Sequence, residues 1–126
     1  MAKWSLDSNM DAMLNEIATC NELVVCSGQP ANYAGVAAVA LARVVLTAGS
    51  GNGDFTLADD TSGRKVTITQ QSDIPIDTSG SATHVALMIG QGGSVLKYVT
   101  TCTSQYLVDT GTVTVPTWKI GVADPV

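Results

Sequence analysis

The side chains best suited to chemistry are three cysteines, Cys20, Cys26 and Cys102, and a single histidine, His84. No two cysteines form a C-x-x-C motif, and one histidine cannot complete a Cys/His zinc set at the usual spacings. Any Ser–His or Cys–His nucleophile pair has to use His84, which stands just before an alternating strand segment with no nucleophile elbow. We therefore expect no hydrolase and no Cys/His metal centre.

The cysteines have two interpretations. Free cysteines are often buried as small hydrophobic side chains. An odd number also leaves one thiol to link to another chain in an oxidising place. Cys20 and Cys26 are six residues apart, so we expect them to approach one another across a turn. Cys102 follows two threonines at a predicted strand end and is the better candidate for an exposed intermolecular disulfide.

Acidic residues gather between two predicted strands. Asp59 and Asp60, with Asp54 nearby, carry the oxygen ligands that Ca²⁺ prefers, but the spacing lacks the pattern of an EF-hand. An acidic turn in solvent is the favoured interpretation. Arg64 and Lys65 follow this turn, and we expect them to compensate its charge locally.

Aromatic residues make up only 5% of the chain, which argues against a sugar-stacking platform. Tyr33 and Tyr106 are the only candidates for exposed loop aromatics. Trp4 precedes the predicted helix in a polar segment, and two interpretations of it stay open. It packs onto the helix as a staple, or it anchors an N-terminal arm on a partner, because aromatic anchors dominate interface energetics.

Composition indicates one small β-rich domain. A chain of 126 residues forms a single core, and 13% charged residues is about half the usual share near 25%. The net charge of −5, with only six Lys and Arg, argues against nucleic-acid binding. No stretch has the roughly 18 apolar residues of a membrane span, and the N-terminus lacks the pattern of a signal peptide. We expect synthesis in a cytoplasm without classical secretion.

One amphipathic helix is predicted, over residues 8–21. Met10, Met13, Leu14 and Ile17 recur at helical spacing and should share one apolar stripe. Ser8 is placed to cap the first turn. Residues 1–7 then form an N-terminal arm, and residues 22–126 form a single β domain.

Short strands separated by turns fill the rest of the chain. Strands are expected at 22–26, at about 38–47 after a helical turn near Tyr33, and in two hairpins, one turning at 59–64 and one at 90–94. Residues 74–76 cross to a further turn, and residues 106–108 form a short strand. About seven or eight strands of this kind predict an antiparallel β-sandwich or barrel-like domain with one short N-terminal helix.

The last strand changes phase. Its apolar residues fall on odd positions as far as Val115 and on even positions from Trp118 onward. One extra residue would keep the inward face continuous, and proline breaks a ladder in any case. We therefore predict a β-bulge at Pro116-Thr117.

The C-terminal half resembles a known group of proteins. The run IDTSGSATHVALMIGQGGSVLKYVTTCTSQYLVDTGTVTVPTWKIGVADPV, with the earlier pieces LVVCSGQPANYAGV and FTLADDTSGRKVTI, is similar to small virion proteins of tailed bacteriophages, generally labelled head decoration or structural proteins. The resemblance covers most of the chain. It implies a virion structural protein without enzyme activity or cofactor, and it carries over no catalytic residues.

Decoration (cement) proteins of this kind form trimers or dimers that bridge neighbouring capsomers. The resemblance thus implies that the partners are the major capsid protein, other virion proteins and further copies of the chain, with the virion as its location. The cysteines would stay reduced in the host cytoplasm and oxidise after release, locking neighbouring copies together. A tail, neck or fibre-base component is the main alternative, and a carbohydrate- or receptor-binding module is a further one.

Overall fold

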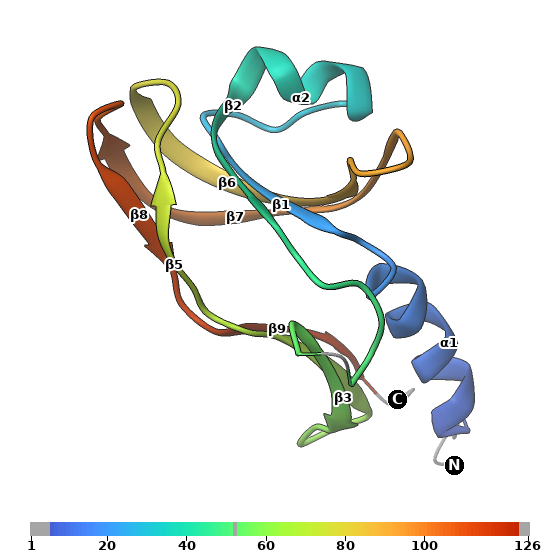
Figure 1. The fold of residues 1–126 in the computed structure, drawn as a ribbon. Helices are drawn as coiled ribbons and strands as arrows, with labels where there is room; N and C mark the ends of the chain where they lie inside the picture. The colour runs from blue at the N-terminus through green and yellow to red at the C-terminus, as the bar shows by residue number, and fades with distance from the viewer. Residues whose placement is uncertain (1–5, 52, 124–126) are drawn as a thin grey trace.

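The computed structural model describes residues 6–51 and 53–123, and these ranges hold two helices and nine strands (Figure 1). The helices are α1 (Asp7–Ile17) and α2 (Tyr33–Val39). The strands are β1 (Glu22–Cys26), β2 (Ala40–Val45), β3 (Phe55–Asp59), β4 (Arg64–Ile68), β5 (Gln71–Pro75), β6 (Gly80–Ile89), β7 (Val95–Leu107), β8 (Thr112–Val115) and β9 (Trp118–Val122). About half of the described residues lie in strands, so the predicted mainly β fold is confirmed.

The strands form three antiparallel sheets. The largest has the order β2-β1-β6-β7, the second has the order β3-β4-β9, and β5 pairs with β8. Figure 1 shows α2 lying over the four-stranded sheet at one end of the molecule, with α1, β3 and β9 at the other end. This arrangement is consistent with the sandwich-like architecture that the strand pattern predicts.

The segment that contains β4 and β5 runs antiparallel to the segment that contains β8 and β9, and both bend at the same corner. β4 and β9 pair below the corner, and β5 and β8 pair beyond it. At the corner the Thr117 hydroxyl accepts a hydrogen bond from the Gln70 backbone N–H at 3.1 Å. The predicted bulge at Pro116-Thr117 is therefore wrong. The phase change arises because the chain leaves one sheet and enters another, and Pro116 stands where no ladder bond is needed.

Two further strand predictions differ from the structure. Residues 71–75 form β5 instead of only crossing to a turn, and residues 106–107 continue β7 instead of forming a strand of their own. Both differences depend on distant pairing, because β5 is stabilised by β8 and the end of β7 by the start of β6.

Alternation along β1 divides the buried residues into two clusters. Leu23 and Val25 point into the main core between the sheets, which surrounds Phe55. Val24 and Cys26 point to the opposite face, where they pack with Val36 and other residues beneath α2. Successive side chains of a strand face opposite sides, so a continuous apolar run such as β1 needs a cover on both faces.

Helix α1 is shorter than predicted. It ends at Ile17, because the chain must be extended by Asn21, whose N–H bonds to the Met88 carbonyl on β6. The predicted cap at Ser8 is wrong, since the residue before the helix is Leu6 and no side chain caps it. Met13 also departs from the predicted stripe, because it is 56% exposed.

Candidate functional site

Cys20 and Cys26 do not approach one another. Both are buried free thiols, Cys20 in the main core and Cys26 in the cluster beneath α2. β1, which ends at Cys26, spans about 13 Å from Glu22, and the two cysteines lie in clusters on opposite faces of the sheet, whereas a disulfide needs Cα atoms within about 7 Å. The expectation of a close pair is wrong.

Burial also keeps these two thiols protonated. Desolvation raises the pKa of Cys20 to about 11 and that of Cys26 to about 11, and the Cys26 thiol donates to the Val24 carbonyl at 3.7 Å. Cys102 is different, because it is exposed as predicted, although it lies in the middle of β7 and not at a strand end. Partial burial raises the Cys102 pKa as well. Its linkage to another chain remains a prediction.

His84 lies within β6 and not before it. Its register partners are Cys26 on β1 and Thr101 on β7. The ring Nδ1 is 2.8 Å from the Thr83 hydroxyl oxygen. Although a cysteine and a histidine are neighbours here, the Cys26 thiol is buried and protonated, so the arrangement provides no activated nucleophile.

Two carboxylates of the acidic turn form ion pairs. Asp59 pairs with Arg64 at 2.8 Å, and Asp60 pairs with Lys119 at 2.8 Å. The Lys119 ammonium, which bonds to Asp60, holds the pKa of that carboxyl below its usual value. Asp54 accepts from the Thr47 N–H at 2.6 Å. Across residues 6–51 and 53–123, no group of three His, Cys, Asp or Glu side chains is placed to hold a metal ion.

Arg64 joins the turn to the N-terminal helix. Its Nε is 2.8 Å from Asp11 Oδ1, and its other nitrogens reach Asp59 and the second Asp11 oxygen. These hydrogen bonds, first those to Asp11 and then that to Asp59, raise the pKa of Arg64. Its predicted local compensation is confirmed for Asp59, and the contact with α1 is an addition that the sequence did not reveal.

A polar cluster at the start of β1 was also missed. The Asn21 side chain accepts from the N–H groups of Gly90 and Gln91 at 3.0 and 3.1 Å and donates to the Gln91 carbonyl. Glu22 is only 5% exposed and accepts from Arg43 at 3.1 Å and from Gln91 at 3.0 Å. Together these bonds fix the loop that leads into β7.

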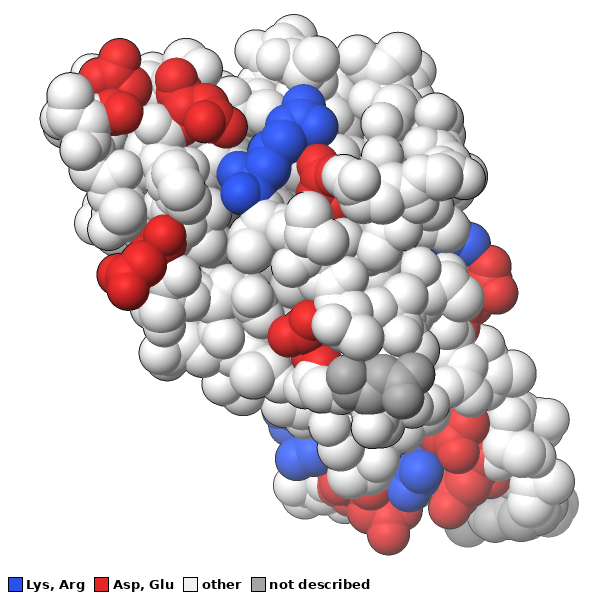
Figure 2. All heavy atoms as spheres, viewed as in Figure 1, with Lys and Arg blue, Asp and Glu red and all other residues white. Residues whose placement is uncertain are grey.

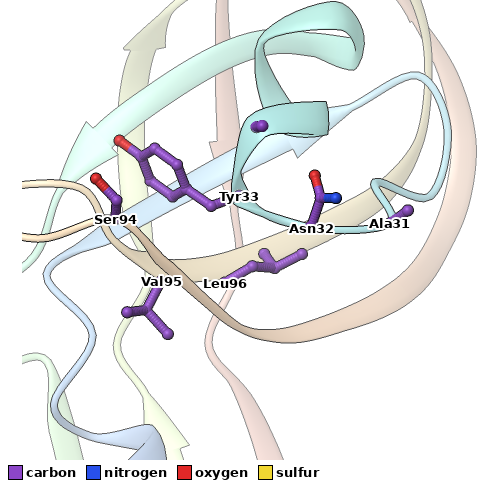
Figure 3. A pocket seen from close by; sticks show the side chains of 7 residues that line it. Ala31, Asn32, Tyr33, Ser94, Val95 and Leu96 are labelled. Carbon is purple, nitrogen blue, oxygen red and sulfur yellow. The ribbon is translucent and has the colours of Figure 1, made fainter.

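A hollow on the surface lies beside α2. It has a volume of about 570 Å³ and is lined by 31–34 and 94–96. Figure 3 shows the Tyr33 ring extending from the helix toward Ser94 on the β6–β7 loop. The Asn32 Oδ1 atom already accepts from the Gly35 N–H at 2.9 Å, so the other polar side-chain groups of the lining are the Asn32 amide nitrogen and the hydroxyls of Tyr33 and Ser94. No described residue of this lining is charged.

Two adjoining hollows lie between β7 and the β8–β9 corner. Their volumes are about 240 and 220 Å³, and both are lined by Val85, Cys102, Val115 and Pro116. The lining is mostly apolar, and the indole N–H of Trp118 is buried nearby without a hydrogen-bond partner. Cys102 thus sits between an apolar groove and the open edge of β7.

Trp4, the candidate interface anchor, lies outside the described residues. No helix in residues 6–51 and 53–123 is long and apolar enough to cross a membrane. Comparison with known proteins gives no family model, no curated protein and no solved structure that matches the chain.

Proposed function

We propose that the protein is a structural protein of a bacteriophage virion, and that it acts as a capsid decoration protein bridging neighbouring capsomers. Its partners would be the major capsid protein or other virion proteins and further copies of itself. The proposal includes no catalysis, no cofactor and no nucleic acid. The observation that carries it is the scarcity of free charge on a rigid, strand-built surface.

Charged side chains are few, and many of them pair with each other. Only 13% of residues are charged, and Arg43, Arg64, Lys97 and Lys119 all form ion pairs with Asp or Glu. Figure 2 shows the charges in small groups, several of them at the end where α1 and β3 lie, with broad uncharged areas between them. Depletion of charge is typical of the core of protein–protein interfaces.

The fold supports the mechanical role that the proposal requires. Three sheets share one main core, and the Arg64–Asp11 ion pair fixes α1 against β4. A decoration protein stabilises a capsid because a modest interface is repeated over many copies. A rigid body can also transmit strain between neighbouring capsomers.

A carbohydrate-binding module receives less support. Tyr33 lies beside Leu96 at the start of β7, whereas Tyr106 lies near its end. The strand between them spans up to about 33 Å of backbone, so the two tyrosines lie at opposite ends of β7 and form no common stacking platform. A tail, neck or fibre-base role fits the same surface as well as a head role does, and the experiment below separates them.

The test is to find the chain in purified virions by mass spectrometry and to locate it by immunogold electron microscopy. Label over the head supports decoration. Label over the tail or neck replaces decoration with the alternative role, and a virion preparation free of the chain refutes the proposal. Adding the purified protein to heads that lack it gives a second readout, since a decoration protein saturates at a fixed number of copies per capsomer.

A further inference from the structure

The sandwich is closed on one side and open on the other. On the closed side, the Leu41 carbonyl of β2 accepts from the N–H groups of Asp77 and Thr78 at 2.8 and 3.2 Å. Next to this contact, Ala42 forms a bridge to Ile76. On the open side lie β7 and β8, whose register partners among the described strands are β6 and β5 and not each other. The two strands thus leave a gap at this side of the core.

The two adjoining hollows described above lie in this gap and form one groove. We call it the β7–β8 groove, and it is defined by the four residues that line both hollows, Val85, Cys102, Val115 and Pro116. The first hollow, of about 240 Å³, extends to Leu107, and the second, of about 220 Å³, extends to Trp118. The groove therefore follows β7 and β8 along most of the open side.

The floor of the β7–β8 groove belongs to the main core. Val25, Ala82 and Val85 line it, are between 3% and 6% exposed, and belong to the core cluster around Phe55. The polar side chains of the lining are neutral and come from β7 and β8, at the rim. Among the described residues that line the groove, none is charged.

An irregularity in β7 explains why the groove is not filled. Between the pairs Ala82–Gln105 and His84–Thr101, four steps along β7 correspond to two steps along β6. The extra residues, 102–104, have short side chains, and the floor residue Ala82 has only a methyl group. Bulges of this kind bend a strand and are common beside functional sites. The space between the strands is thus built into the pairing of β7.

An occupant of the groove must suit an apolar space that is set back between two sheets. Water suits it poorly, because a buried water needs two to four polar partners and the side chains of the floor offer none. A flat protein surface would cover the rim and leave the space beneath it empty. An engineered apolar cavity of about 150 Å³ in another protein binds benzene, and each hollow here is larger. Size and polarity therefore favour a small apolar molecule.

Trp118 adds an aromatic surface at one end of the groove. Its ring lines the second hollow and packs against the Tyr98 ring with centroids 6.2 Å apart. Its indole N–H is buried and has no hydrogen-bond partner among the described residues, so packing alone holds the ring. Aromatic rings attract each other in offset or edge-to-face contacts beyond the area that they bury. An occupant with a ring gains from this contact.

We propose that the β7–β8 groove is a binding site for a small uncharged apolar molecule of one or two rings. The ring lies on Val25, Ala82 and Val85, next to Trp118, and its outer edge meets the neutral side chains of the rim. A ligand that binds only the folded chain stabilises it, so an occupied groove closes the open side of the sandwich. The proposal stands on the groove and does not depend on the virion role.

The first test titrates toluene into the full chain and follows the valine methyl groups by NMR. The methyl signals of Val85 and Val115 should shift and saturate. Those of Val24 and Val36, which lie beneath α2, should not move. The absence of shifts up to the solubility limit of toluene overturns the proposal. Equal shifts in both sets also overturn it, because they indicate non-specific binding.

Cys102 gives a second readout in the same protein, because its thiol lies where the two hollows meet. At a toluene concentration ten times the dissociation constant, only about one chain in eleven has an empty groove, so alkylation of Cys102 by iodoacetamide should slow about tenfold. An unchanged rate would show that toluene binds elsewhere and would overturn the proposed place.

Two phenylalanine variants of the irregular segment test the groove directly. Cys102→Phe places a large side chain where the hollows join, and should weaken toluene binding by about tenfold or more, which corresponds to about 1.4 kcal/mol. Ser104→Phe is the matched control, because Ser104 is exposed and lines neither hollow; it should leave the affinity unchanged. Circular dichroism checks that both variants are folded. Equal affinities in the two variants refute the site.

The chemical class of the ligand is tested with benzoate, which has a similar ring and one negative charge. An unpaired carboxylate loses its hydration in an apolar site, and the lining offers no cation. Benzoate should therefore bind at least about tenfold more weakly than toluene, equivalent to about 1.4 kcal/mol. Benzoate binding as tight as that of toluene would refute an uncharged ligand, while the location of the chain in virions is a separate result.

Discussion

Gly90 is the position where one methyl group should have a large and specific effect. A Cβ atom built there would lie 2.6 Å from the Glu22 Oε2 atom and 3.3 Å from the Met88 Cε atom. The carboxylate cannot simply move away, because it is buried and held by Arg43 and Gln91. We predict that Gly90→Ala breaks the contact between Glu22 and the β6–β7 loop.

The expected loss of stability follows from the hydrogen bond to the Glu22 Oε2 atom, which must move to make room for the methyl group. Gln91 Nε2 donates to that same Oε2 atom at 3.0 Å, and a hydrogen bond to a charged group contributes about 1.5–3 kcal/mol. A loss of about 2 kcal/mol in the free energy of unfolding is therefore expected. With an unfolding entropy of about 2.1 cal/mol/K per residue over 126 residues, the melting temperature should fall by about 8 °C.

Denaturant unfolding at fixed protein concentration measures the change. Gly28→Ala is the matched control, because a Cβ atom there meets only Val39 Cγ1 at an ordinary 3.7 Å; its effect should be below about 1 kcal/mol. In a Glu22→Ala background, adding Gly90→Ala should cost much less than in the wild type, since neighbouring effects are not additive. The steric argument is refuted if Gly90→Ala is as stable as the control, or if its cost is unchanged without Glu22.

Two other predictions concern ionisable groups. Lys119→Gln should raise the pKa of Asp60, because the Lys119 ammonium lowers it, and NMR titration of the carboxyl group measures the change. A carboxyl group with a lowered pKa in the folded state stabilises the fold above its unfolded pKa, and this contribution is lost as the pH falls through the folded pKa. An unchanged Asp60 titration would contradict the ion pair. In reduced native protein a thiol reagent should modify Cys102 alone, since burial raises the pKa of Cys20 and of Cys26 to about 11. Denaturant should then release all three thiols, and fast labelling of two or three in the native state would show that the buried pair is accessible.

Local patterns were sufficient for much of the fold. The apolar run at 22–26, the hairpin turning at 59–64 and the hairpin turning at 90–94 all appear as predicted. In each of these the signal lies within the element, as a run of β-formers bounded by turn residues. The helix was also found, although its end and its cap were misplaced.

The errors fall where distant segments decide the structure. Pro116-Thr117 lies at a corner between two sheets because β4 and β5 bend at the same point, and no local pattern reports a partner some fifty residues away. Cys20 and Cys26 are close in sequence but separated by an extended strand. The Asn21–Glu22 cluster was missed because its partners lie on the β6–β7 loop, so only the pairing of β1 with β6 brings them together.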